Sequence, residues 1–127
     1  MAIRLRATEA AEQQALFHWA SIMESREPRL RLLYHIPNGG YRFKSTAGQL
    51  KTLGVGPGVP DLCLPCPARG YHGLYIEMKA SNGKVSNAQG MWVAALCEQG
   101  YDAVVLFGWV SVMQHLCWYL ERNDILG

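Results

Sequence analysis

The sequence predicts an α/β fold in which a mixed β-sheet is flanked by helices, in the order α-β-(α)-β-β-α-β-α. Two observations lead to this prediction. Apolar residues recur at helical spacing in three separate stretches, and short runs rich in β-branched and aromatic residues alternate with those stretches. The chain has 127 residues, and about 100–200 residues per domain is usual. We therefore expect residues 1–127 to form a single domain.

Three helices are predicted from apolar periodicity and from the residues that begin and end them. The first covers residues 8–24, with Thr8 as its N-cap. The second covers residues 86–99 and presents an apolar face. The third covers residues 110–120 and is apolar nearly all round, which is typical of a subunit interface or of deep burial. Residues 45–53 could form a further short helix.

Four strands are predicted between these helices. The first, residues 31–36, stops at a Pro-Asn-Gly-Gly turn. The second and third, residues 61–64 and 74–79, are separated by a short turn, which makes them a hairpin. The last, residues 101–107, is rich in β-branched and aromatic residues, so we expect it to be central and buried.

Composition excludes a membrane protein more clearly than it indicates a partner. No apolar run reaches the roughly 18 residues of a membrane span, and the first residues lack the apolar segment of a secretory signal. We therefore expect a soluble intracellular protein. The formal net charge is only +2, but eight of the 12 lysines and arginines precede residue 52. This asymmetry would suit a phosphate-binding surface, and it would equally suit the solvated faces of early helices.

Four cysteines raise the question of a metal site. Cys63 and Cys66 have the spacing of half a zinc site, and with His72 they could form one. Cys97 and Cys117 stand alone in apolar helical patterns. The better expectation is that all four are reduced and serve as small apolar residues.

The strongest chemical signal is the combination of Asp61, Glu77 and Lys79. Residues two apart in a strand share a face, so Glu77 and Lys79 project together while Met78 points the other way. An edge-strand salt bridge would explain that pair alone. A loop rich in glycine and proline, residues 54–60, adds Asp61 at the start of the partner strand. Two carboxylates meeting across a hairpin form an oxygen-rich site suited to Mg²⁺ or Mn²⁺.

Three motifs together resemble a known family: Gly58-Val-Pro-Asp61, Tyr75-Ile-Glu-Met-Lys79 and Ser86-Asn-Ala-Gln89. Their order and spacing are similar to those of the PD-(D/E)XK nuclease superfamily and, more closely, of its VRR-NUC branch in the stand-alone form of phages and bacteria. The resemblance spans most of the chain. It implies a restriction-endonuclease-like sheet and a cytoplasmic, metal-dependent endonuclease acting on duplex or branched DNA such as Holliday junctions. A homodimer would suit that last substrate.

The resemblance also implies a role for each matching residue. Asp61 and Glu77 match the metal-binding carboxylates, and the backbone carbonyl of Met78 would be a further ligand. Lys79 matches the catalytic lysine, which would act on the attacking water. The expected cofactor is Mg²⁺ or Mn²⁺. A different reading, a non-cleaving DNA-binding or scaffold module with a nuclease-like fold, is disfavoured because the whole set is intact.

Two of the matching residues have alternative explanations. Gln89 matches the glutamine characteristic of the branch, but Ser86 and Gln89 also form a capping box, in which the glutamine side chain bonds back to the N-cap backbone. Glu9 matches the glutamate of the N-terminal helix, but a carboxylate in a first turn also complements the helix dipole. Glu12 competes with Glu9 for this place, and the spacing of Glu9 to Gln13 favours Glu9.

DNA contacts are expected near the Pro-Asn-Gly-Gly turn, where Asn38 tolerates positive φ and two cations follow. The predicted nucleic-acid-binding residues are Asn38, Arg42, Lys44 and Lys84. His35 is expected to be a strand residue with a satisfied ring. The tryptophans at 92, 109 and 118 are expected in the core rather than in a base-stacking platform.

Overall fold

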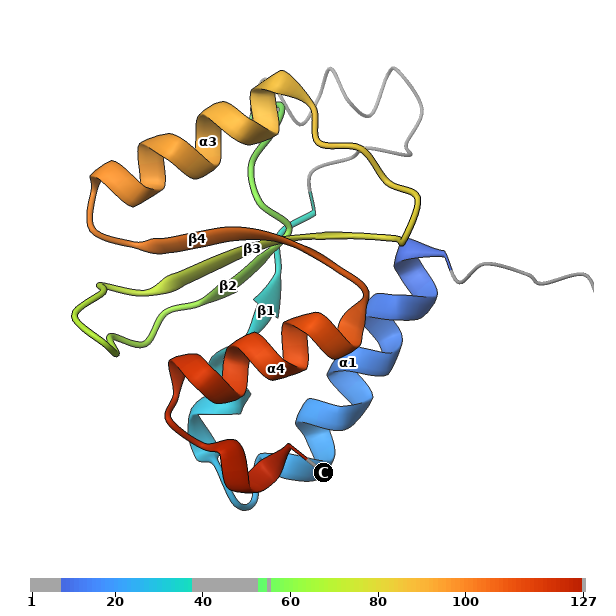
Figure 1. Ribbon diagram of the computed structural model, residues 1–127, viewed down its shortest axis with the longest axis vertical. Helices are drawn as coiled ribbons and strands as arrows, with labels where there is room; N and C mark the ends of the chain where they lie inside the picture. The colour runs from blue at the N-terminus through green and yellow to red at the C-terminus, as the bar shows by residue number, and fades with distance from the viewer. Residues whose placement is uncertain (1–7, 38–52, 55, 127) are drawn as a thin grey trace, which may run out of the picture.

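The computed structural model describes residues 8–37, 53–54 and 56–126, which are drawn in colour in Figure 1. The elements in this part of the chain follow the predicted order. They are α1 (Glu9–Met23), the 3₁₀ helix η1 (Pro28–Leu32), β1 (Tyr34–His35), β2 (Leu62–Leu64), β3 (Leu74–Lys79), α3 (Asn87–Glu98), β4 (Asp102–Phe107), α4 (Trp109–Tyr119) and the 3₁₀ helix η2 (Asn123–Ile125). The predicted helix over residues 45–53 lies almost wholly outside the described residues.

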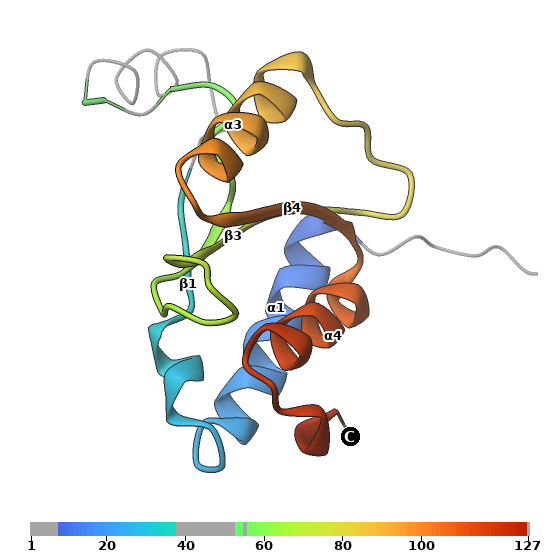
Figure 2. The ribbon, with the colours of Figure 1, turned by 60° about the vertical axis from the view of Figure 1, so that its left-hand side comes forward.

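The sheet is mixed, as predicted, with the strand order β1-β2-β3-β4. The pairs β1/β2 and β2/β3 are antiparallel, so residues 61–79 form the expected hairpin, whereas β3 and β4 are parallel. Helix α3 lies on one side of the sheet, and α1 and α4 lie together on the other (Figures 1 and 2). The α/β prediction is therefore confirmed, with helices on both faces.

The prediction that residues 101–107 form a central, buried strand is wrong. Within the described residues β4 pairs with β3 alone and is the last strand of the sheet. Its buried residues lie at its start, and Phe107 at its end is 45% exposed. Helix α3 packs against this strand, and a strand covered by a helix needs the same β-branched residues as a central one.

The predicted strand over residues 31–36 is too long, because its first part belongs to η1. Pro28 stands at the start of that 3₁₀ helix, where a missing backbone N–H costs nothing. The Glu27 carboxylate accepts a hydrogen bond from the Arg29 backbone N–H at 3.0 Å and caps the turn. Extended structure begins only at Tyr34, which leaves β1 with two residues.

The core lies between the sheet and the layer of α1 and α4. It contains five fully buried strand residues and is closed by buried residues of both helices. The strand residues are Leu62, Leu64, Leu74, Ile76 and Met78, and the helical residues include Leu16, Val112 and Leu116. Helix α4, predicted to be apolar nearly all round, buries one face, while Val110 at its start remains exposed.

Helix α3 packs against β4, but none of its residues is fully buried, and much of the predicted apolar face is exposed. Met91 is 72% exposed and Trp92 is 38% exposed, and both line a shallow apolar groove with Pro57, Ala88 and Ala95. Trp118 is also exposed, with the Arg69 guanidinium 4.3 Å above its ring. The expectation of three core tryptophans therefore holds only for Trp109, which packs against the core.

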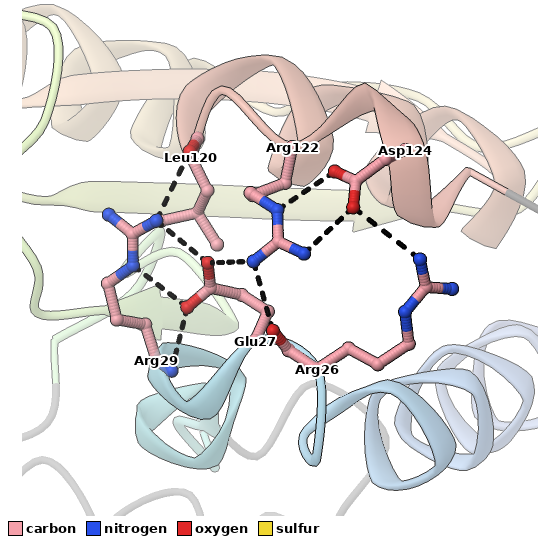
Figure 3. A network of polar contacts seen from close by, with 6 residues as sticks. All are labelled: Arg26, Glu27, Arg29, Leu120, Arg122 and Asp124. Atoms are coloured by element: carbon pink, nitrogen blue, oxygen red, sulfur yellow. Dashed lines mark hydrogen bonds and ion pairs between the residues drawn. The ribbon is translucent and has the colours of Figure 1, made fainter.

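A network of ion pairs joins the segment after α1 to the segment after α4 (Figure 3). Glu27 is buried and accepts from Arg29 at 2.8 and 2.9 Å and from Arg122 at 3.0 Å. Asp124 accepts from Arg122 and Arg26. The hydrogen bonds to Glu27, above all those from Arg29, lower the pKa of this carboxyl group to about 2. Arg26 and Arg29, which could have faced a phosphate, are already engaged within the protein.

None of the helices in the described part of the chain combines the length and the apolarity needed to cross a membrane.

Candidate active site

Three carboxylates from distant parts of the sequence meet at one point. Glu9, Asp61 and Glu77 each offer an oxygen, and these atoms all lie within 4.8 Å of one another. Glu9 is the first residue of α1, Asp61 directly precedes β2, and Glu77 belongs to β3. Asp61 and Glu77 are buried, while Glu9 is exposed. The predicted convergence of Asp61 and Glu77 across the hairpin is therefore present.

The hairpin register explains the place of Asp61. Leu62 pairs with Ile76 in the antiparallel hairpin. The preceding residue, Asp61, therefore stands opposite Glu77, which follows Ile76. The Asp61 carboxylate accepts a hydrogen bond from the Met78 backbone N–H at 3.0 Å, which holds its Oδ1 towards β3. A carboxylate has about four lone-pair positions, so the group can still accept a further partner.

The backbone of Asp61 is held by the first strand. Its carbonyl oxygen accepts from the Ile36 backbone N–H at 2.7 Å and lies 3.0 Å from His35 Nδ1. Because a carbonyl can only accept, this contact places a proton on Nδ1 of His35. The prediction of a strand histidine with a satisfied ring is confirmed for that nitrogen.

The two oxygens of Glu77 have different surroundings. Its Oε2 lies 3.6 Å from Lys79 Nζ and accepts from Gln89 Nε2 at 3.2 Å. Its Oε1 is buried and has no hydrogen-bond partner among the described residues. A buried carboxylate oxygen without a partner is unfavourable unless a cation or a water meets it. Together with the two neighbouring carboxylates, this oxygen fits a hard divalent cation such as Mg²⁺ or Mn²⁺.

The electrostatics of the pair lead to the same conclusion. Burial raises the pKa of Glu77 to about 7, and the neighbouring Asp61 charge adds to the rise while Lys79 opposes it. Burial also raises the pKa of Asp61 to about 6, against the effect of the Met78 N–H. Both carboxyl groups therefore resist ionisation in the metal-free protein, and a bound cation would reverse this.

Gln89 completes the predicted capping box and also contacts the acidic site, with different atoms. Its backbone N–H donates to Ser86 Oγ at 3.2 Å, and its side-chain Oε1 accepts from the Ser86 backbone N–H at 2.9 Å, which completes the capping box of α3. Its side-chain Nε2 remains available and donates to Glu77. The capping bond therefore decides which end of the amide faces the acidic site.

Glu12, the competitor of Glu9, lies outside the acidic cluster. Its Oε2 accepts from the Trp109 backbone N–H at 2.7 Å, at the first turn of α4. The N-cap of that helix is Gly108, which has no side chain to offer. Sequence reasoning missed this contact, although a helix that starts after glycine needs an acceptor from elsewhere.

Of the predicted nucleic-acid-binding residues, Lys84 is exposed in the connection between β3 and α3. The other three, Asn38, Arg42 and Lys44, lie outside the described residues.

The zinc alternative finds no geometric support. Within the part of the chain that the structure describes, Glu9, Asp61 and Glu77 form the only group of three potential metal ligands. Cys63 and Cys66 are free and buried, and the His72 ring packs edge-on against Tyr101 at 5.7 Å. Cys117 is also buried, as expected of small apolar residues, whereas Cys97 is exposed.

Comparison with known proteins agrees with this geometry. The model of the VRR-NUC domain matches residues 10–108, a range that contains Asp61, Glu77, Lys79 and Gln89. The chain belongs to the VRR-NUC domain family. This family is part of the PD-(D/E)XK superfamily, so the VRR-NUC chain has a nuclease-like fold.

A solved structure described as a VRR_NUC domain protein has the same fold. It superposes with a TM-score of 0.78 and 28% sequence identity, over 94% of this chain and 93% of the other. Among curated proteins, none matches this sequence. The family and the fold of this VRR-NUC chain thus rest on the domain match and on the structural likeness.

Proposed function

We propose that this VRR-NUC protein is a divalent-metal-dependent deoxyribonuclease that hydrolyses phosphodiester bonds within DNA strands. One observation supports this most directly: the buried Oε1 of Glu77 has no hydrogen-bond partner among the described residues, while Glu77 clusters with two further carboxylates and pairs through Oε2 with the buried Lys79. The ion pair with Lys79 and the hydrogen bond from Gln89 both engage Oε2, so Oε1 stays open to a cation.

The metal ion would be bound by the acidic cluster, which consists of Glu9, Asp61 and Glu77. Asp61 and Glu77 would hold the ion, with Glu9 completing the site directly or through water and the Met78 carbonyl as a further ligand. A bound Mg²⁺ or Mn²⁺ would lower the pKa of a coordinated water and offset negative charge on the phosphate. Glu9 is exposed at the N-terminus of α1, so the cluster opens to solvent on that side.

Lys79 and Gln89 act around this cluster. The Lys79 ammonium is buried beside Glu77, where it would orient the attacking water, take its proton, or stabilise charge on the phosphate. Gln89 holds the Oε2 of Glu77. Lys84, with Asn38, Arg42 and Lys44, would contact the phosphates of the DNA backbone. Cutting of branched DNA by a homodimer stays a prediction.

The test is a cleavage assay on duplex, single-stranded, flap and four-way-junction DNA, with Mg²⁺, with Mn²⁺ and with a chelator. We expect cleavage only with a divalent ion, and we expect Lys79→Ala and Asp61→Asn to abolish it. Asn keeps the acceptor for the Met78 N–H and removes only the charge, so this variant should remain folded. Glu98→Gln, an exposed carboxylate on α3, is the control.

Wild-type cleavage by Asp61→Asn in Mg²⁺ would contradict the proposal. DNA binding without cleavage on any substrate would favour the non-cleaving module instead. The solution mass of the same protein, measured free and with a four-way junction, tests the homodimer.

A further inference from the structure

Gly58 lies where the loop before Asp61 crosses the first turn of α3. Its φ is +88°, and a Cβ added there would lie 2.5 Å from the carbonyl oxygen and 2.8 Å from the Cβ of Ala88. Both distances are below the 3.0 Å that real Cβ atoms keep from their neighbours. Two of the atoms in the way belong to the helix backbone, so no side-chain rotation could relieve the contact. The loop and the helix therefore touch directly, with no room for a side chain at position 58.

Two other glycines show that positive φ does not require such packing. Gly54 and Gly70 have φ values of +95° and +83°, and at either position an added Cβ would find no atom of the described residues within 4 Å. At these positions glycine serves the backbone conformation alone. At Gly58 it serves both the conformation and a close approach between two segments.

Each of the touching segments carries a residue of the acidic site. Asp61 follows Gly58 by three positions, and Gln89 directly follows Ala88. The side-chain amide of Gln89 cannot turn freely, because Ser86 holds its Oε1 while its Nε2 donates to Glu77. Any displacement of the first turn of α3 therefore moves the donor that faces Glu77 Oε2.

We propose that Gly58 is a positioning residue of the active site: its contact with Ala88 holds the loop of Asp61 against the helical turn that carries Gln89. This inference rests on the proposed nuclease function. A side chain at position 58 would separate the two segments and lengthen the Gln89–Glu77 bond. Misplacement of a reacting group by about 1 Å can cost about 100-fold in rate.

The test compares Gly58→Ala with Gly54→Ala, since both place alanine at positive φ in one loop and only the first meets the helix. Cleavage kinetics on duplex DNA, Mn²⁺ affinity by calorimetry and the thermal midpoint are measured for both. We expect kcat of Gly58→Ala to fall about 10- to 100-fold below that of Gly54→Ala, with weaker Mn²⁺ binding and with KM for DNA unchanged. Equal kcat values and equal Mn²⁺ affinities would overturn the inference.

A second pair approaches the contact from the helix, in case Gly58→Ala does not fold. Ala88→Val adds bulk towards Gly58, whereas Ala95→Val adds the same β-branched residue to the same groove away from the loop. We expect the first variant to lose kcat and the second to retain it, and equal kcat values would again overturn the inference. If wild-type protein and Gly54→Ala both fail to cut DNA, the nuclease function itself is wrong. If the wild type cuts DNA and Gly58→Ala and Ala88→Val match their controls in kcat, only the positioning role is contradicted.

Discussion

The side-chain amide of Gln89, in the first turn of α3, donates a 3.2 Å hydrogen bond to Oε2 of Glu77 in strand β3. The opposite end of the same amide accepts from the N-cap backbone of α3. One end of the Gln89 amide thus caps the N-terminus of α3, and the other end donates to one oxygen of the buried Glu77 carboxylate. The two functions depend on different atoms, so substitution can separate them.

Gln89→Glu should retain the cap and lose the contact with Glu77. Glutamate at the N3 position still accepts from the Ser86 backbone, but it would place a second negative charge beside Glu77. Loss of a hydrogen bond to a charged group is worth about 1.5–3 kcal/mol, or about 10- to 100-fold in rate. We expect that loss in kcat with a thermal midpoint close to wild type. Gln89→Ala should lower both kcat and the thermal midpoint. Full activity in Gln89→Glu would show that the hydrogen bond to Glu77 does not contribute to cleavage.

Glu9 and Glu12 should respond to substitution in opposite ways. Glu12→Ala removes the acceptor of the Trp109 N–H and should cost about 1 kcal/mol of unfolding free energy, as loss of a helix cap does. Glu9→Ala removes one of three neighbouring carboxylates, so we expect weaker Mn²⁺ binding and no loss of stability. Urea unfolding and Mn²⁺ calorimetry on both variants check this. The assignment fails if Glu12→Ala is the variant that loses metal affinity.

The metal-free protein should lose stability as the pH rises. The pKa of Asp61 is raised from 3.8 to about 6 and that of Glu77 from 4.5 to about 7, so the folded state binds protons more tightly than the unfolded chain across this range. Stability therefore falls between about pH 4 and pH 7. We expect a lower thermal midpoint in chelator at pH 8 than at pH 5, a smaller difference in Glu77→Gln, and a larger rise on adding Mn²⁺ at pH 8. A midpoint independent of pH in chelator would contradict the burial of these charges.

Glu27→Gln should destabilise the fold without touching the chemistry. The buried Glu27 carboxylate neutralises Arg29 and Arg122, and loss of its charge leaves Arg29 without a carboxylate and Arg122 with Asp124 alone (Figure 3). Breaking a buried pair costs about 3–5 kcal/mol, and partial exposure of the arginines should reduce this to about 2–3 kcal/mol. Urea unfolding measures the loss, and kcat of the folded fraction should equal wild type. Asp124→Asn, an exposed member of the same network, should cost much less.

Local signals predicted a large part of the fold and of the candidate site. Thr8 and Ser86 were predicted as N-caps, and the structure places both there with side-chain bonds to their helices. The hairpin and the strand Leu74–Lys79 follow from alternation and turn residues. Because a strand has a period of two, the common face of Glu77 and Lys79 could be inferred from spacing, and the predicted hairpin then brought Asp61 to Glu77.

What the sequence could not predict depends on partners far away in the chain. The contact of Glu12 with Trp109 spans 97 positions, and no local pattern marks it. The place of β4 at the end of the sheet depends on which strands pair, not on its own residues. The exposure of Trp92 likewise depends on the absence of a covering layer over α3 in the described chain. The capping bond of Gln89 and a contact with the acidic residues looked like alternatives, because the sequence does not show that opposite ends of one amide can make both.

Strand β3 leaves almost no position open to neutral change. Leu74, Ile76 and Met78 fill the core from one side of the strand, while Glu77 and Lys79 form the acidic site from the other. Only Tyr75 is partly exposed. In a saturation mutagenesis library selected for folded, active protein, this six-residue segment should therefore tolerate fewer substitutions than α3, where no side chain is buried. An inserted or deleted residue within the strand would exchange the two sides at once and destroy core and site together.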